Sequence, residues 1–406
     1  MLVLRESAPE SSLPRKICLP ALSKHGSQLL AAGRIAEARA FFEQILSIDP
    51  KSTEAHSGLY RIASTLGDRL RAGFHLGMAM QWPAIFSLPC HSIEKPIPIL
   101  MFLSIDGCNT LLLRYLNQNL FQIHIAIVEF LHESTVLPPH NLVINAIGDA
   151  DVRSEALAAT EHIIARTSAP IINSPAQVLE TGRCRIADRL ATIPGVLTAR
   201  SVLFPREYLT ASTSGAMLRE QGFDFPLLIR SPGYHMGQNF IRIETPSALS
   251  EAISDLPGSD LIVMQHLDGR GTDGNFRKYR VMMIDSQLYP VHLAIAKHWK
   301  IHYFHSDMAD SPAHRAEEAR FLTNMEGALG PLVMRALTQI EQTLALDYGG
   351  IDFGLNQNGQ LLLYEANATM AVRPPDSDPM WDYRRRAIER IYTSIQQLFL
   401  SRSSAD

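Results

Sequence analysis

The feature that most constrains this chain is a pair of apolar segments near its C-terminal end, joined by a short polar turn. Residues 348–367 read YGGIDFGLNQNGQLLLYEAN. An Asn-Gly pair between two apolar runs is a strong short-range signal for a β-hairpin. We therefore predict two adjacent antiparallel strands that belong to a buried sheet.

Three polar side chains interrupt this apolar hairpin. Asp352 lies in the first strand, whereas Glu365 and Asn367 end the second strand and, being two residues apart, share one face. Folding the second strand back places Asp352 beside Glu365. Two carboxylates and an amide oxygen on one face suit Mg²⁺, which prefers hard oxygen ligands together with phosphate groups. The sequence predicts a metal site at these three residues; the alternative is an exposed hairpin with solvated acids.

Basic residues upstream complement these acids. Arg230 ends an apolar strand and precedes a loop bounded by Gly233 and Gly237, whose backbone donors suit a polyphosphate. In residues 276–281, FRKYRV, alternation places Lys278 and Arg280 on one face. Cations beside acids fit a magnesium-bound nucleotide better than either set alone.

An internal repeat precedes this region. Residues 29–46, LLAAGRIAEARAFFEQIL, align with residues 62–80, IASTLGDRLRAGFHLGMAM, so that Gly33 falls on Gly67 and Ala38 on Ala72. This offset of about 34 residues resembles the tetratricopeptide repeat, whose grooves commonly hold peptides or partner helices. The alternatives are a generic helical hairpin or a module that only packs on its neighbour.

Bulk properties narrow the class of protein. A chain of 406 residues suggests roughly two to four domains. The net charge of −4 argues against a nucleic-acid-coating role, which needs a basic surplus. We expect no membrane span, because no apolar run reaches the roughly 18 residues that one needs, and the N-terminal residues do not read as a signal peptide. The cysteines form no CxxC pair and favour a reduced, cytoplasmic protein: Cys18, Cys90, Cys108 and Cys184.

Over roughly residues 97–400, the order of motifs resembles the ATP-grasp superfamily. The family's pattern is an α/β domain, two cations, a glycine-rich loop, an apolar hinge strand, a basic strand and a closing Asp…Glu-x-Asn set. In this sequence the two cations are Arg183 and Arg230, and the closing set is Asp352, Glu365 and Asn367. The family usually has lysine at the two cationic positions; arginine keeps the charge but is bulkier and less point-like.

The resemblance implies a fold class and domain boundaries. We expect an α+β chain with an ATP-grasp fold of two α+β subdomains, preceded by a small α/β domain and an N-terminal helical repeat. The expected segments are a flexible tail (1–20), tetratricopeptide-like helices (21–95), the α/β domain (96–175), the ATP-grasp domain (176–400) and a second tail (401–406).

The resemblance also implies roles for individual residues. The backbone around Gln265 and Leu267 would contact adenine, and Asp268 or Asp273 would contact ribose. Arg280 and Lys297 would contact phosphate or an acyl intermediate. ATP and two Mg²⁺ ions bridged by Glu365 are the implied cofactors.

The predicted function is an ADP-forming ligase that activates a small-molecule or peptide carboxylate as an acyl phosphate for attack by an amine or thiol. Two alternatives remain: an ATP-grasp kinase, and a non-catalytic nucleotide-binding adaptor whose repeat module binds a partner. Substrate identity would be determined around Arg280, Lys297 and Arg373.

A cluster of histidines offers a competing interpretation. His298, His302 and His305 lie close together in the sequence, but no acid or cysteine stands at a recognisable zinc spacing. We interpret them, with His292, as substrate-pocket or core histidines.

Overall fold

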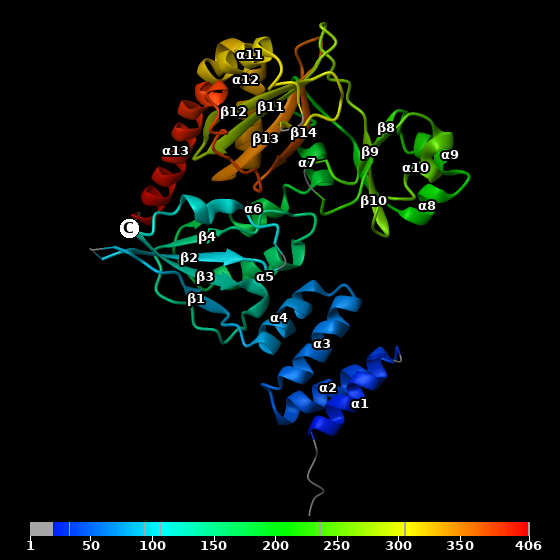
Figure 1. Ribbon diagram of the computed structural model, residues 1–406, viewed down its shortest axis with the longest axis vertical. Coiled ribbons are helices and arrows are strands. Elements are labelled where there is room, and N and C mark those ends of the chain that lie inside the picture. Colours follow the sequence, from blue (N-terminus) through cyan, green and yellow to red (C-terminus); the bar gives the residue numbers. More distant parts are fainter. Residues whose placement is uncertain are drawn as a thin grey trace, which may run out of the picture. The chain divides into compact units, whose positions relative to one another are not determined.

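The computed structural model describes residues 19–31, 33–92, 95–105, 107–234, 237–303 and 306–404 (Figure 1). The chain divides into two compact units, residues 1–84 and 85–406. Residues 1–18 of the predicted N-terminal tail lie outside the described residues, and its last two residues begin the first helix.

The described residues of the first unit form four helices: α1 (Leu19–Ala31), α2 (Ile35–Ile48), α3 (Thr53–Thr65) and α4 (Arg69–Met80). The starts of α1 and α3 differ by 34 residues, as do those of α2 and α4. Gly33 and Gly67 occupy the two equivalent turns with φ of 74° and 75°, a backbone conformation that favours glycine. The observed spacing matches the predicted repeat; its assignment to the tetratricopeptide family stays a prediction.

Local sequence explains why these helices form and pack. The side chain of Ser52 caps α3 by accepting from the Ala55 amide, and that of Asp68 caps α4 by accepting from the Arg71 amide. Phe42 on α2 is buried against Gly58 on α3, where any larger side chain would collide with its ring. The close approach of these two helices therefore depends on glycine.

The second unit begins with a five-stranded sheet of order β1-β3-β2-β4-β5. The three pairings among β2, β3, β4 and β5 are parallel, and β1 is antiparallel to β3. The predicted boundary lies at residue 96, whereas β1 already pairs with β3 of this sheet upstream of it. The elements are β1 (Ile85–Ser87), β2 (Ile97–Leu103), η1 (Leu111–Tyr115), β3 (Phe121–Ile127), η2 (Val128–Phe130), β4 (Leu142–Asn145), α5 (Ser154–Ile164) and β5 (Ile171–Ile172).

A second, antiparallel sheet has the order β7-β10-β8-β9. Short helices pack on it around a core that includes Phe223, Ile229 and Leu249 (Figure 1). Helices α6 (Pro175–Leu179) and α7 (Arg183–Leu190) precede it. Its elements are β7 (Ser201–Pro205), α8 (Arg206–Thr210), α9 (Ser214–Glu220), β8 (Leu227–Arg230), β9 (Phe240–Ile243), η3 (Pro246–Ala248), α10 (Leu249–Ala252) and β10 (Asp260–Gln265).

The third sheet has the order β12-β11-β13-β14-β6, antiparallel except where β14 meets β6. The strands are β6 (Val196–Thr198), β11 (Phe276–Ile284), β12 (Gln287–Ala296), β13 (Tyr348–Leu355) and β14 (Leu361–Asn367). The other elements are α11 (Pro312–Thr323), α12 (Met325–Leu344), η5 (Pro379–Arg384) and α13 (Arg385–Ser403).

Helices α11 and α12 are separate, because Asn324 leaves the helical conformation and caps α12. One sequence prediction about this region needs correction. The expected C-terminal tail from residue 401 begins inside α13, whose apolar face, including Leu398 and Phe399, is buried. Residues 405–406 lie outside the described part of the chain.

The predicted hairpin is present. The Asn356 amide donates to the Gln360 carbonyl, and Gly359 turns the chain with a φ of 73°. Asp352 pairs with Glu365 across the two strands, and a bulge follows between Asp352 and Phe353. No helix within the described ranges is long and apolar enough to cross a membrane.

Candidate functional site

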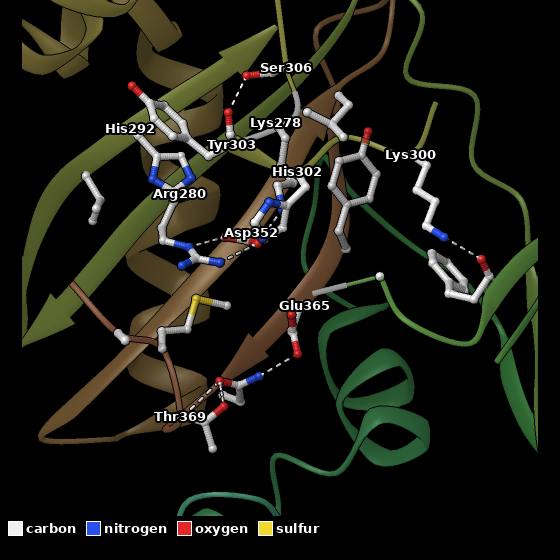
Figure 2. Close-up of a pocket in the computed structure, with 18 of the residues that line it drawn as sticks. Lys278, Arg280, His292, Lys300, His302, Tyr303, Ser306, Asp352, Glu365 and Thr369 are labelled. Atoms are coloured by element: carbon white, nitrogen blue, oxygen red, sulfur yellow. Dashed lines mark hydrogen bonds and ion pairs between the residues drawn. The ribbon is translucent and has the colours of Figure 1, made fainter. Parts of the chain in front are cut away.

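A cavity of about 880 Å³ opens beside β11, β13 and β14 (Figure 2). Residues of the second sheet and the loop after β2 also line it, including Arg230, Gln265 and Cys108. Its volume is in the range of sites that hold small molecules. The cavity therefore lies where the three sheets of the second unit meet.

Asp352 lies at the centre of this cavity (Figure 2) and is only 2% exposed. The Arg280 guanidinium donates to both of its oxygens, from Nε at 2.6 Å and from Nη2 at 2.8 Å. The Lys278 ammonium donates to Oδ2 at 3.0 Å. The strand register explains this geometry, because Arg280 on β11 is directly opposite Asp352 on β13.

Glu365 is held from the other side. Arg183, the first residue of α7, donates from Nη2 to Glu365 Oε1 at 2.8 Å. Asn367 donates its side-chain nitrogen to the same oxygen at 2.9 Å, while its own amide oxygen accepts from Thr369. The Nε atom of Arg183 also lies 3.3 Å from Oδ2 of Asp151. The three predicted metal ligands thus meet in one cavity, together with cations that the sequence placed near them.

The buried charges set the ionisation of both acids. Burial alone would raise the pKa of Asp352, but Arg280 and Lys278 lower it well below its usual range. Burial likewise opposes ionisation of Glu365, and Arg183, Arg230 and Arg280 together lower its pKa. Both side chains are therefore carboxylates at neutral pH.

The two carboxylates offer oxygens to a divalent cation, whereas the Asn367 amide oxygen already accepts from the amide and the hydroxyl of Thr369. Glu365 lines the cavity, and its Oε2 accepts no hydrogen bond from any described residue. Each Asp352 oxygen retains acceptor capacity beside its present partners. Within the described ranges, no three His, Cys, Asp or Glu side chains cluster closely enough to hold a metal alone. Two carboxylates and an amide would need oxygens from a bound phosphate to complete a Mg²⁺ shell.

The cavity carries a surplus of positive charge. Among the described residues, seven arginine or lysine side chains line it, against three carboxylates. Asp352 and Glu365 are already compensated by cations, whereas three other lining cations have no carboxylate partner among the described residues: Arg230, Lys300 and Arg373. This balance favours a polyanionic occupant.

Comparison with solved structures identifies the fold. D-alanyl-alanine synthetase A from Vibrio cholerae matches with a TM-score of 0.50 and 13% identity, covering 77% of this chain and 98% of that one. The chain has the ATP-grasp fold. The predicted α+β class is confirmed, and at this identity the likeness shows the fold alone.

Two further similar structures fall below a TM-score of 0.5. VanG D-Ala:D-Ser ligase from Enterococcus faecalis has a TM-score of 0.47 and 13% identity, covering 76% of this chain and 100% of that one. D-alanine–D-alanine ligase from Bacillus anthracis, complexed with ATP, has a TM-score of 0.45 and 12% identity, covering 76% and 96%. No protein-family model and no curated protein matches the chain.

The predicted glycine-rich loop follows β8. Arg230 lines the cavity beside the Phe240 ring, 5.6 Å from its centroid, and donates to the Tyr234 carbonyl. Burial lowers the pKa of Arg230 to about 10, so the side chain remains charged. Gly237 lines the cavity, whereas Gly233 lies against Val152 outside it. Residues 235 and 236 of this loop lie outside the described residues.

The predicted hinge segment is only partly in the site. Gln265 and Leu267 line the cavity, with His266 between them packed edge-on against Trp299. Asp268 is exposed and accepts from the Arg270 amide, and Asp273 is paired with Arg277. Neither aspartate lines the cavity, since the chain leaves the site after Leu267.

The structure places Lys297 outside the cavity. Strand β12 ends at Ala296, and Lys297 is exposed beyond it, with its backbone N–H donating to Asp307. It does not line the cavity. Lys300 does, and its ammonium donates to the Phe240 carbonyl at 2.8 Å. The sequence could not predict that Lys300, and not Lys297, lines the cavity, because strand alternation no longer applies beyond Ala296.

The histidines separate into different surroundings. His292 and His302 line the cavity, whereas His298 is exposed and does not. His305 lies outside the described residues. The substrate-pocket interpretation therefore has structural support for two of the four.

Sequence reasoning missed one group of lining residues. Tyr303, Trp381 and Arg384 come from the segments after β12 and after β14. Arg384 lies in the run Arg384–Arg386, which reads as the solvated start of a helix. Arg373, which the sequence did suggest, also lines the cavity.

Proposed function

We propose that this protein is an ATP-dependent, ADP-forming ligase that joins a carboxylate to an amine or a thiol. The observation that carries the proposal is the buried pair Asp352–Glu365, opposite one another on adjacent strands and surrounded by cations in one cavity. The Vibrio cholerae protein of the same fold is described as a D-alanyl-alanine synthetase, which supports this class of reaction.

The chain's own residues would divide the chemistry among them. Arg183 and Arg230 hold the phosphates of ATP, and the backbone of Gln265 and Leu267 meets the base. Mg²⁺ held by Asp352, Glu365 and Asn367 would neutralise charge on the transferring phosphoryl group.

The reaction itself needs no side-chain nucleophile. An oxygen of the substrate carboxylate attacks the terminal phosphorus, and the bond to ADP breaks. The amine or thiol then attacks the acyl carbon, and inorganic phosphate leaves with the transferred oxygen. Arg280 and Lys278 are placed to stabilise the negative charge that develops in both steps.

The helical unit suggests a macromolecular component. Helix starts 34 residues apart favour a tetratricopeptide-like module, and we propose that it binds a peptide or protein partner that presents one substrate. We also propose a cytoplasmic location, because Cys90, Cys108 and Cys184 are free thiols.

Turnover with substrate pools tests this proposal. The purified protein is incubated with Mg-ATP and pools of carboxylates, amines and thiols, while ADP and inorganic phosphate are followed separately. A ligase releases both in equal amounts, and Glu365→Gln abolishes release while the variant stays folded. ADP without phosphate indicates a kinase. Absence of turnover together with no nucleotide-induced rise in Tm contradicts the proposal.

A further inference from the structure

One part of the cavity is built from an arginine and aromatic rings. Arg384, at the end of η5, lines the cavity and is 7% exposed. Its guanidinium carbon lies 4.3 Å from the centroid of the Tyr303 ring, and Trp381 lies 6.2 Å from the same ring. Met308, almost fully buried, lines the cavity as well. This part of the cavity therefore combines one cation, Arg384, with an apolar wall formed by Tyr303, Trp381 and Met308.

Glu318 on α11 fixes this arrangement without taking part in the cavity. It is 0% exposed and accepts from the Tyr383 hydroxyl at 2.5 Å and the Tyr303 hydroxyl at 3.2 Å. The Leu293 amide donates to its other oxygen. Its oxygens are therefore occupied, and its role is to hold the rings and Arg384 in place.

Arg384 retains donors for a ligand. Its Nε lies 3.4 Å from Glu318 Oε1, an ion pair without hydrogen-bond geometry. Its two terminal nitrogens donate to no described residue. A buried guanidinium with unused donors at a cavity wall is suited to a planar anion, which it can bind through two parallel hydrogen bonds.

His292 lies against the same Tyr303 ring as Arg384. It is 7% exposed, lines the cavity, and its Nε2 is buried with no hydrogen-bond partner. Its ring lies 4.7 Å from that of Tyr303, and it stands opposite Arg280 in the strand register (Figure 2). Burial, with Arg280, Arg384 and Lys278 facing it and only Asp352 opposing, holds its pKa well below the usual value. The imidazole is therefore uncharged at neutral pH and has one N–H to donate.

We propose that Arg384 and His292 bind the carboxylate of an aromatic or large apolar carboxylic acid, whose body lies against Tyr303, Trp381 and Met308. This inference rests on the proposed function, since it names the class of acid that the enzyme activates. The proximity of His292 to Arg280 places the bound carboxylate beside the charged centre at Asp352. Inorganic phosphate is also an anion, but it has no apolar part that could contact Tyr303, Trp381 and Met308.

Tryptophan fluorescence can test this directly, because the chain contains three tryptophans: Trp82, Trp299 and Trp381. In a Trp82→Phe, Trp299→Phe variant, Trp381 alone reports on the proposed subsite. The probe is 3-phenylpropionate, compared with acetate, with 3-phenylpropionamide and with inorganic phosphate. We expect saturable binding of 3-phenylpropionate at least about tenfold tighter than of any of the other three, because each lacks either the ring or the carboxylate.

Substitution of the arginine sharpens the test. Arg384→Lys keeps the charge beside Glu318 but loses the fork, so we expect about tenfold weaker 3-phenylpropionate binding with an unchanged far-UV spectrum. Arg386→Lys, on the exposed side of the same run, is the matched control and should not change the affinity. Equal binding of the acid and its amide, or an Arg384→Lys variant with full affinity, overturns the proposal.

A second reporter separates this inference from the proposed function. Trp299, beside His266 and Phe240, reports on the hinge side in a Trp82→Phe, Trp381→Phe variant. The probe there is a non-hydrolysable magnesium-ATP analogue. Binding of the analogue without 3-phenylpropionate contradicts only the carboxylate subsite; binding of 3-phenylpropionate without the analogue contradicts only the ligase proposal.

Discussion

The two sides of the cavity are built in different ways. On one side, Arg280, Asp352 and Glu365 stand on paired strands, and the register alone brings them together. On the other side, Tyr303 and Arg384 come from irregular or short helical segments that a buried acid, Glu318, holds in place. Strand pairing positions side chains through its register, whereas connecting segments vary more freely among proteins of one fold.

The largest effect is expected on the strand side. Asp352→Asn removes the only acid paired with both Arg280 and Lys278 among the described residues. The variant leaves two largely buried cations without a counter-charge, and we expect a loss of about 3 kcal/mol in the free energy of unfolding measured with urea.

Asp376→Asn is the matched control for that measurement. Asp376 also lines the cavity but is exposed and on a connecting segment. Its substitution should change the free energy of unfolding by no more than about 0.5 kcal/mol. Equal losses in the two variants would show that the strand and connecting sides do not differ as described.

Arg230 tests the nucleotide contacts. Arg230 lines the cavity and has no carboxylate partner within the described part of the chain, although it donates to the Tyr234 carbonyl, so we expect Arg230→Gln to affect ligand binding more than the fold. We expect the Kd for a non-hydrolysable ATP analogue to rise about 10- to 100-fold by calorimetry, with little loss of stability. Arg242→Gln, which removes an arginine paired with Glu244 outside the cavity, should leave the Kd unchanged.

His292 stands on β12 and lies beside Tyr303 of the connecting side. Its ionisation makes the free energy of unfolding depend on pH. Its folded-state pKa is depressed, so the unfolded chain binds a proton that the folded chain does not. Stability is then complete above the unfolded pKa of about 6.5 and falls as the pH drops below it, by up to about 1.4 kcal/mol per pH unit. Urea unfolding at pH 7 and pH 5 should show a smaller difference for His292→Gln than for the wild type, whereas His298→Gln should behave like the wild type.

The smallest expected effect concerns two lysines three residues apart. Lys300→Ala should raise the Kd for the ATP analogue a few-fold, because Lys300 lines the cavity and holds the Phe240 carbonyl. Lys297→Ala should leave it unchanged, because that side chain is exposed outside the cavity. The reverse outcome would restore the sequence-based assignment of Lys297.

The same contrast explains what the sequence could predict. The Asn-Gly turn and the two-residue strand period are local signals, and they correctly placed Asp352 beside Glu365 and Lys278 beside Arg280. The internal sequence repeat likewise predicted the 34-residue offset of the N-terminal helices. Their roles in binding metal and nucleotide stay predictions.

The remainder of the site depends on tertiary packing. Glu318 lies in a charged stretch that reads as an exposed helix, yet it is fully buried because Tyr303, Tyr383 and Arg384 converge on it. Tyr383 is 65 residues away in sequence. No local pattern could join these residues, and the same limit explains the misplaced Lys297 and the exposed Asp268.

The central claim is that this cavity activates a carboxylate with ATP, and the fate of one oxygen atom tests it most directly. Carboxylic acids labelled with ¹⁸O, 3-phenylpropionate among them, are incubated with the protein, Mg-ATP and an amine pool, and the released phosphate is analysed by mass spectrometry. An acyl phosphate intermediate transfers one labelled oxygen to each phosphate released. ADP formation with unlabelled phosphate, or with no phosphate released, would contradict the claim.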